Sequence, residues 1–521
     1  MERTTTDNST RLLNLIWIFV GLKLLMHLAA IWLEGYGVFR DELYYFACAD
    51  HLATGYVDQP PLSIWILSAF TAIFGDHWQV VRIIPAVFGG LTMLVLLKWV
   101  RLLGGSLLAI AVAGTAFMFA PINIGFASVF SMNSIDLFFW SVCFYQITKT
   151  LRKPENTWHW ITLGIFVGLG MMNKISISWF AIGLIVYLIT TPQRKLLLSQ
   201  GPYVAGIIAL IIFIPFIIWN ISHDMAHIEF AKNASRFKYA GITRADFLQG
   251  IILLENPLSL VLLIASFFFF LNRKYSFPDR AAIIIFFTTF LILIIKGQVK
   301  SEYLAGAYLA VFATGSVQLA EIQKPIIRKA VIISLLTAYF LFGSLMVPLA
   351  LPILEEEHFI RYNKWLGIDN RNNEGKEESE LPQFYADMHG WEELAKNVSD
   401  AWMSLPETER SHAVVWANNY GEAGAIDYYR DKYPLPPVLS RHNNYYLWGQ
   451  EYIKKSDIKT FIILGGSEET HKKSLRDVTL FTIHTCQYCM PYENDMPVFI
   501  GSDPDPSLEL LELFSSDRNY N

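Results

Sequence analysis

The stretch FRDELYYFACADHLATGYVDQPPLSIW, residues 39–65, lies between two strongly apolar segments. It contains four acidic residues and a single cation, Arg40. The pair Asp41-Glu42 comes soon after the first apolar segment, and a Tyr-x-Asp-x-Pro-Pro turn at residues 56–61 follows it. The functional role of these acidic residues depends on which side of a membrane the stretch faces.

The composition indicates that lipid surrounds much of the chain. Hydrophobic residues make up 53% and charged residues 17% of the 521 residues, whereas soluble proteins average about 25% charged residues. Apolar runs recur over residues 12–350, while residues 355–521 have an ordinary globular composition. The formal charge of −5, without a Lys/Arg tract, gives no sign of nucleic-acid binding. We therefore predict a polytopic α-helical membrane domain, residues 1–350, and a C-terminal α/β domain, residues 351–521.

The apolar runs predict eleven membrane spans. The first lacks a following small-residue cleavage site, which favours an uncleaved helix over a signal peptide. A break at Asn173-Lys174 divides an apolar run that is too long for one span. The predicted spans are 12–34, 80–97, 105–121, 133–148, 158–173, 175–191, 201–221, 249–271, 281–296, 303–320 and 330–350.

Basic residues set the expected orientation, because cytoplasmic loops are enriched in Lys and Arg. With the N-terminus in the cytoplasm, five inner loops carry such residues: Lys98/Arg101, Lys149/Arg152/Lys153, Arg194/Lys195, Arg273/Lys274/Arg280 and Lys324/Arg328/Lys329. This places the chain in the inner or plasma membrane with residues 35–79, residues 222–248 and the C-terminal domain outside.

Four outer acids are candidates for chemistry. Asp41-Glu42 begins a segment that can form an interfacial helix ending at Gly55, although Asp41 could simply cap that helix. Asp58 lies in a turn made rigid by Pro60 and Pro61. Asp136 lies near the outer end of the fourth span, where an ionisable group is costly unless it faces a polar cavity or is capped locally.

The outer segments also hold cations, against the general charge rule. They are Lys232, Arg236, Lys238, Arg244 and Lys300. Either the loops tolerate them, or they bind an anion at the outer membrane surface.

A divalent metal is an alternative for the start of the second outer segment. His223 and His227 would share one face of a helix, with Glu229 or Asp58 as a further ligand. Alternatively, these are ordinary polar residues of a surface loop that bind no metal.

A local disulfide between Cys486 and Cys489 is an option outside the cell.

These motifs together resemble the C-type glycosyltransferases that use lipid-phosphate sugars. The likeness is to family 39, with the lipid A aminoarabinose transferases and protein O-mannosyltransferases. It is carried by Asp41-Glu42, by the turn at residues 56–61, by Asp136, and by Lys300 with Tyr303. The stretches ANNYGEAGAIDYY (417–429), LPPVLSRHNNYYLWG (435–449) and CMPYEN (489–494) extend it into the soluble part.

The resemblance implies transfer of a sugar from a polyprenyl phosphate, undecaprenyl or dolichyl, to a lipid, glycan or protein acceptor on the outer face. It implies that Asp41 is the base or the group that orients the acceptor. We expect Asp41 to be the base, with Glu42, Asp58 or Asp136 orienting the base and the acceptor. Gln59 occupies a position where the aminoarabinose transferases have a phosphate-binding Lys, which argues against lipid A as the acceptor. The donor phosphate would then contact Tyr56, Gln59, Lys232, Arg236, Lys238, Lys300 and Tyr303.

Two other classes of function remain open. A transporter or flippase for an anionic lipid-linked solute could use Lys23 and His27 in the first span as a proton relay. A binding or assembly protein would act through the soluble domain. In that domain we predict a charged linker at 355–380, a helix at 384–403, and buried strands at HAVVWA (412–417) and TFIILGG (460–466).

Overall fold

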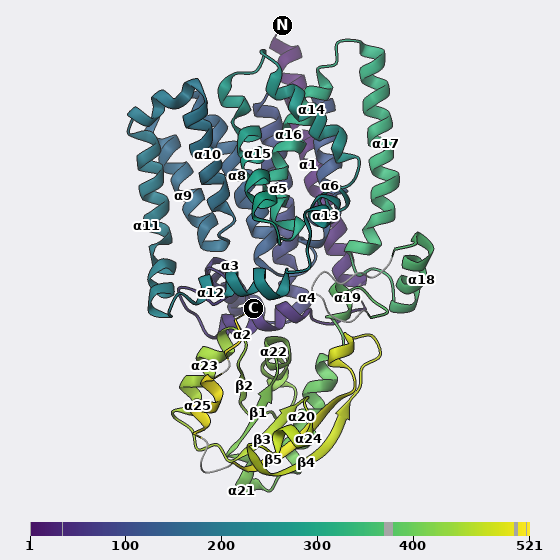
Figure 1. Cartoon of the computed structure of the whole chain (residues 1–521). Helices are drawn as coiled ribbons and strands as arrows, with labels where there is room; N and C mark the ends of the chain where they lie inside the picture. The colour runs from purple at the N-terminus through teal and green to yellow at the C-terminus, as the bar shows by residue number, and fades with distance from the viewer. Residues whose placement is uncertain (1, 34, 369–378, 505–508, 517, 521) are drawn as a thin grey trace.

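A computed structural model describes residues 2–33, 35–368, 379–504, 509–516 and 518–520. Figure 1 shows long helices side by side in one bundle, with a small sheet domain at the end remote from the N-terminus. Short helices lie between the two parts (Figure 1). The predicted architecture, a helical membrane domain followed by an α/β domain, is confirmed.

The long helices follow the apolar runs of the sequence closely. They are α1 (Glu2–Leu33), α5 (Ile83–Leu102), α6 (Leu107–Met118), α8 (Met132–Arg152), α9 (Thr157–Asn173), α10 (Ile177–Thr190), α11 (Gly201–Ser222), α13 (Arg244–Leu254), α14 (Ser259–Leu271), α15 (Phe277–Lys296), α16 (Ala305–Ala320) and α17 (Pro325–Ala350). The predicted break at Asn173-Lys174 falls between α9 and α10.

Not all of these helices qualify as membrane spans by length and composition. Within the described residues six do, or up to eight if each of two bent helix pairs is one span. The predicted span 249–271 is one such pair, since α13 and α14 meet at 98°. Asn256 has a positive φ of 73° there and Pro257 follows it, so the helix cannot continue. The count of eleven stays a prediction.

Residues 35–79, which are predicted to be the first outer segment, contain more helix than predicted. It contains α2 (Arg40–Asp50), the apolar helix α3 (Leu62–Phe74) and α4 (Trp78–Val81). The predicted interfacial helix corresponds to α2. Its predicted end at Gly55 is wrong, because α2 ends at Asp50. The Tyr56 hydroxyl donates to the Cys48 carbonyl and accepts from the Ala53 N–H, both at 3.1 Å, and so folds the chain back.

Other short helices connect the bundle. They are α7 (Pro121–Gly125), the 3-10 helices η1 (Pro192–Leu198) and η3 (Ser301–Leu304), α12 (Ala226–Asn233) and the π-helical turn η2 (Ala234–Lys238).

The C-terminal domain has a five-stranded sheet in the order β2-β1-β3-β5-β4. β1 (Ala413–Ala417) pairs in parallel with β2 (Val438–Ser440) and β3 (Thr460–Leu464), whereas β5 (Met496–Pro504) is antiparallel to β3 and to β4 (Leu475–His484). The two predicted strands are β1 and β3. The remaining helices are α18 (Glu356–Leu366), α19 (Gln383–Ala386), α20 (Trp391–Ser404), α21 (Glu407–Arg410), α22 (Tyr420–Tyr428), η4 (Tyr429–Asp431), α23 (Asn444–Ile453), α24 (Glu468–His471), η5 (Pro491–Glu493) and α25 (Leu510–Ser515).

Three smaller predictions for this domain need correction. The helix predicted over 384–403 is two helices, α19 and α20, separated at Gly390, whose φ is 85°. The predicted linker 355–380 includes α18, and its residues 369–378 lie outside the described part of the chain. Cys486 and Cys489 are free thiols, and the Cys489 thiol lies 3.3 Å from the Cys486 carbonyl oxygen.

Helix α2 belongs to the cores of both parts. Leu43 and Tyr44 on α2 are buried in one apolar cluster with Val415 and Ile462 of the sheet. Two glycines of α22 permit this contact, because a Cβ on Gly424 would lie 2.9 Å from the Leu43 carbonyl carbon and one on Gly421 would lie 2.7 Å from the Arg40 side chain. Helix α2 is therefore fixed against the C-terminal domain.

Candidate active site

A cavity of about 420 Å³ lies where the bundle meets the soluble domain. Its charged and polar lining comes from α2, from the start of α8, from η2 and η3, and from residues 382–387 and 420 of the soluble part. These lining residues include Arg40, Asp41, Asn133, Lys238, Lys300, Glu302, Gln383, Asp387 and Tyr420. Of the predicted site residues, the cavity collects Asp41, Lys238 and Lys300.

Asp41 is a half-buried acid that lines this cavity. It lies in the first turn of α2, where a carboxylate is favoured by the unpaired N–H groups of the helix. Its Oδ1 accepts a hydrogen bond of 2.7 Å from the Tyr420 hydroxyl. The carboxylate is thus held by the soluble domain while it faces the cavity.

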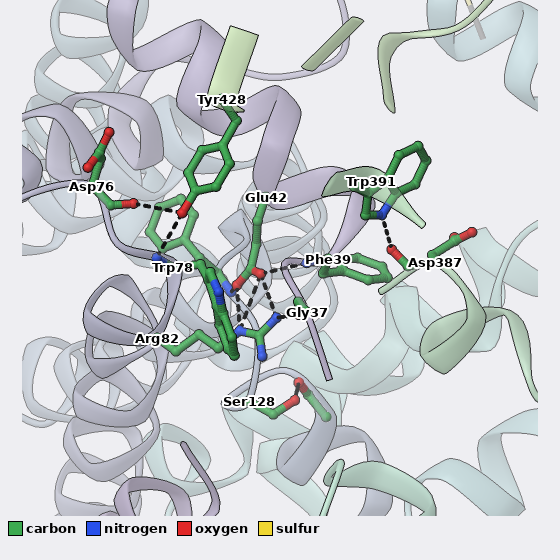
Figure 2. Close-up of polar contacts among 12 residues, drawn as sticks. Gly37, Phe39, Glu42, Asp76, Trp78, Arg82, Ser128, Asp387, Trp391 and Tyr428 are labelled. Carbon is green, nitrogen blue, oxygen red and sulfur yellow. Dashed lines mark hydrogen bonds and ion pairs between the residues drawn. The ribbon is translucent and has the colours of Figure 1, made fainter. Parts of the chain in front are cut away.

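Glu42 has a different environment, which Figure 2 shows. Its carboxylate accepts from the Arg82 guanidinium at 2.7 Å and from the backbone N–H groups of Phe39 at 3.0 Å and Phe130 at 2.8 Å. The side chains of Glu42 and Arg82 are 1% and 0% exposed, and Arg82 lies 4.3 Å over the Trp78 ring. Glu42 therefore anchors the start of α2 and does not line the cavity.

Asp58 lies beside the cavity. It accepts a hydrogen bond of 3.0 Å from the Tyr44 hydroxyl. Burial raises its pKa to about 7, against the opposing hydrogen bond from Tyr44, and the nearby charges of Asp41 and Lys238 also act on it. Asp58 is therefore electrostatically coupled to the residues of the cavity.

Asp136 lies outside the cavity, in a second polar layer that it forms with Ser176 and Lys174. Its Oδ1 accepts from the Ser176 hydroxyl at 2.7 Å, and its Oδ2 lies 4.0 Å from the Lys174 ammonium. Lys174 donates to Asn133 at 2.7 Å, and Asn133 lines the cavity. The sequence prediction uses Lys174 only as the break between two spans, although a lysine beside two apolar runs is itself a functional signal.

Tyr303 connects these two layers. The Lys174 ammonium lies 5.4 Å from its ring centroid, and its hydroxyl bonds the Tyr239 hydroxyl at 3.2 Å. The Lys300 ammonium lies 5.4 Å from the Tyr239 ring. The predicted pair Lys300 and Tyr303 is therefore joined through Tyr239.

The predicted cations fall into two groups. Lys238 and Lys300 line the cavity of Asp41, whereas Lys232 and Arg236 line a separate cavity of about 680 Å³ with Lys296 and His227. The four predicted cations therefore do not line one common cavity.

Tyr56 and Gln59 do not line either cavity. Both side chains are fully buried. The Tyr56 hydroxyl bonds the end of α2, and the Gln59 amide oxygen accepts from Ser63 at 3.4 Å. They stabilise the turn that carries Asp58, and their contact with the donor phosphate stays a prediction.

The two histidines do not share a helix face. His223 follows the end of α11, Asp224 and Met225 have positive φ, and α12 begins at Ala226. His227 Nδ1 lies 3.0 Å from the Val57 carbonyl oxygen, and burial lowers its pKa to about 4. Glu229 pairs with Arg518 at 2.5 Å. Within the described residues no group of three His, Cys, Asp or Glu side chains is placed to hold a metal.

Comparisons with known proteins agree on the class of fold. Residues 58–219 match the family model described as dolichyl-phosphate-mannose-protein mannosyltransferase. The chain is 22% identical over 207 residues to the lipid A galacturonosyltransferase RgtD of Rhizobium johnstonii, over 39% of this chain and 43% of that protein. It is 25% identical over 170 residues to the undecaprenyl phosphate-α-4-amino-4-deoxy-L-arabinose arabinosyl transferase of Pseudomonas savastanoi pv. phaseolicola, over 31% of each. The chain thus spans less than half the length of these relatives.

The fold extends beyond those matched segments. The crystal structure of ArnT from Cupriavidus metallidurans bound to undecaprenyl phosphate superposes with a TM-score of 0.60 at 12% identity, over 95% of this chain and 98% of that one. Its apo structure gives 0.61 over 93% and 97%. The chain therefore has the fold of the C-type glycosyltransferases.

Proposed function

We propose that this chain, a relative of the C-type glycosyltransferases, moves a sugar from a polyprenyl phosphate to an acceptor hydroxyl at the outer membrane surface. One observation carries the proposal. The carboxylate of Asp41 shares a single cavity with the ammonium groups of Lys238 and Lys300, where the bundle meets the soluble domain. The matched family and the likeness to ArnT support the same class of reaction.

In the proposed reaction Asp41 is the general base. It takes the proton of the acceptor hydroxyl while that oxygen bonds to the anomeric carbon of the sugar. The bond from the same carbon to the phosphate oxygen breaks, and the lipid phosphate leaves with the bonding electrons. Because attack and departure occur on opposite faces, a single displacement inverts the anomeric centre.

Cations are needed where the leaving phosphate gains charge. Lys238 and Lys300 are the candidates, because they share the cavity with Asp41. Lys232 and Arg236 line the other cavity, so we assign them no direct part in this step. Asp136 and Lys174 reach the cavity through Asn133 and would position its wall.

The site location also fits a membrane-held donor. A polyprenyl tail remains in the bilayer, so the sugar phosphate is presented at the membrane surface and not in bulk water. The expected orientation of the chain places this cavity on the outer face.

The direct test is donor cleavage by the purified full-length protein in detergent or nanodiscs. Wild type and Asp41→Asn are incubated with a panel of polyprenyl-phosphate sugars and acceptors, and products are followed by mass spectrometry. Loss of a general base costs about 10²–10⁴-fold in rate. Asp76→Asn is the matched control, since Asp76 is an exposed carboxylate of the same outer segment.

Near-normal transfer by Asp41→Asn would remove its assignment as the base. Failure of wild type to cleave any donor, with intact lipid-linked sugar crossing the bilayer of proteoliposomes, would favour the transporter instead.

A further inference from the structure

We propose that Tyr420, from the soluble domain, is a positioning residue for Asp41. This inference rests on the proposed function, because it gives the soluble domain a part in the chemistry assigned to Asp41. Its central observation is the hydrogen bond of 2.7 Å from the Tyr420 hydroxyl to Asp41 Oδ1.

The ring of Tyr420 is held on several sides. It is 9% exposed, and its centroid lies 4.8 Å from the Arg40 guanidinium carbon, 5.1 Å from the Tyr44 ring and 4.8 Å from the His442 ring. A side chain packed in this way has little freedom to change rotamer. The hydroxyl therefore presents its proton to the carboxylate from a fixed direction.

The helix that carries Tyr420 is fixed as well. Asn419 caps α22 by accepting from the N–H groups of Gly421 at 2.8 Å and Glu422 at 3.1 Å. Gly421 and Gly424 let α22 approach the backbone of α2. The distance between Tyr420 and Asp41 is thus set by helix packing and not by a flexible loop.

Two further hydrogen bonds hold Arg40, the residue before Asp41. The Arg40 guanidinium donates to the Tyr492 hydroxyl at 3.1 Å, and the Arg40 N–H donates to the Asp387 carbonyl at 2.9 Å. Arg40 and Asp41 are consequently tied to three separate segments of the soluble domain. These contacts orient the first turn of α2 in the cavity.

The hydrogen bond gives the two carboxylate oxygens of Asp41 different roles. Oδ1 accepts from Tyr420, and within the described residues no hydrogen bond engages Oδ2. Oδ2 is therefore the oxygen that takes the acceptor proton. The other charged groups that face this carboxylate are Arg40, Asp58, Lys238, Lys300, Glu302 and Asp387.

The test compares Tyr420→Phe with wild type in the purified full-length protein. Losing a hydrogen bond to a charged group should lower kcat by about 10- to 100-fold, with the donor KM unchanged. Tyr428→Phe is the matched control, since Tyr428 lies on the same helix and its hydroxyl lies 3.4 Å from the backbone oxygen of Asp76 (Figure 2).

Two further measurements keep the outcome decisive. In a double-mutant cycle, Tyr420→Phe should cost little in the Asp41→Asn background if it acts through that carboxylate. Isotope-edited infrared spectra, with Asp41→Asn subtracted, should show a shifted Asp41 carboxylate stretching band in Tyr420→Phe, even without turnover, because the carboxylate loses its phenol donor.

An inactive wild type would defeat the proposed function but leave the infrared result to decide the role of Tyr420. An unchanged carboxylate band with an unchanged kcat, or equal losses in Tyr420→Phe and Tyr428→Phe, would overturn the inference.

Discussion

Asp41 and Glu42 are adjacent in the sequence but face different surroundings. Successive residues of an α-helix point about 100° apart, so Asp41 faces the cavity while Glu42 enters the core against Arg82. The sequence identifies this acidic pair but not which of the two is accessible. It also cannot reveal the partner of Asp41, because Tyr420 lies 379 residues away along the chain.

At the residue scale, we expect Glu42→Gln to be strongly destabilising. The substitution leaves the buried Arg82 cation without its countercharge, and breaking such a pair typically costs about 3–5 kcal/mol. Thermal or denaturant unfolding in detergent measures the loss. Glu468→Gln makes the same change in the exposed pair with Lys472, where about 0–1 kcal/mol is expected. Equal effects of the two substitutions would contradict a structural role for Glu42.

At the element scale, the apolar runs predict the long helices well because lipid requires continuous backbone hydrogen bonding. The errors occur where local chemistry overrides hydropathy. Asn256-Pro257 bends one predicted span, and the positive φ at Asp224 and Met225 separates the two histidines. Hydropathy does not predict α3, because its apolar residues lie within a segment that is assigned as an outer loop.

The packing of α22 on α2 gives a prediction at this scale. A Cβ introduced by Gly424→Ala would lie 2.9 Å from the backbone of Leu43, so the helices must move apart. Overpacking of this kind costs about 1–3 kcal/mol, and transfer activity should fall with it. Unfolding and donor-cleavage assays measure both effects. Gly206→Ala, with nothing within 4 Å of its Cβ, is the control and should not destabilise, because Ala is favoured over Gly in a helix interior. No loss in Gly424→Ala would mean that the contact is loose.

At the scale of the whole molecule, the charge pattern predicts which end faces the cytoplasm. We expect Glu407→Cys in the soluble domain to react with a membrane-impermeant maleimide in intact cells whose outer membrane, where present, is permeabilised. Lys195→Cys, on an inner loop, should react only after the inner membrane is opened. Both are exposed positions. The labelling uses a Cys486→Ser background, because the other three cysteines are buried. The reverse pattern would overturn the assigned orientation and the outer-face reaction.

The close seating of α22 on α2 has a practical meaning for protein engineering. A chimera that joins the bundle of one relative to the soluble domain of another would place a foreign helix against α2. Such a hybrid should function only if the matching surface, from Arg40 to Tyr44 on one side and Tyr420 to Gly424 on the other, is transplanted as a unit.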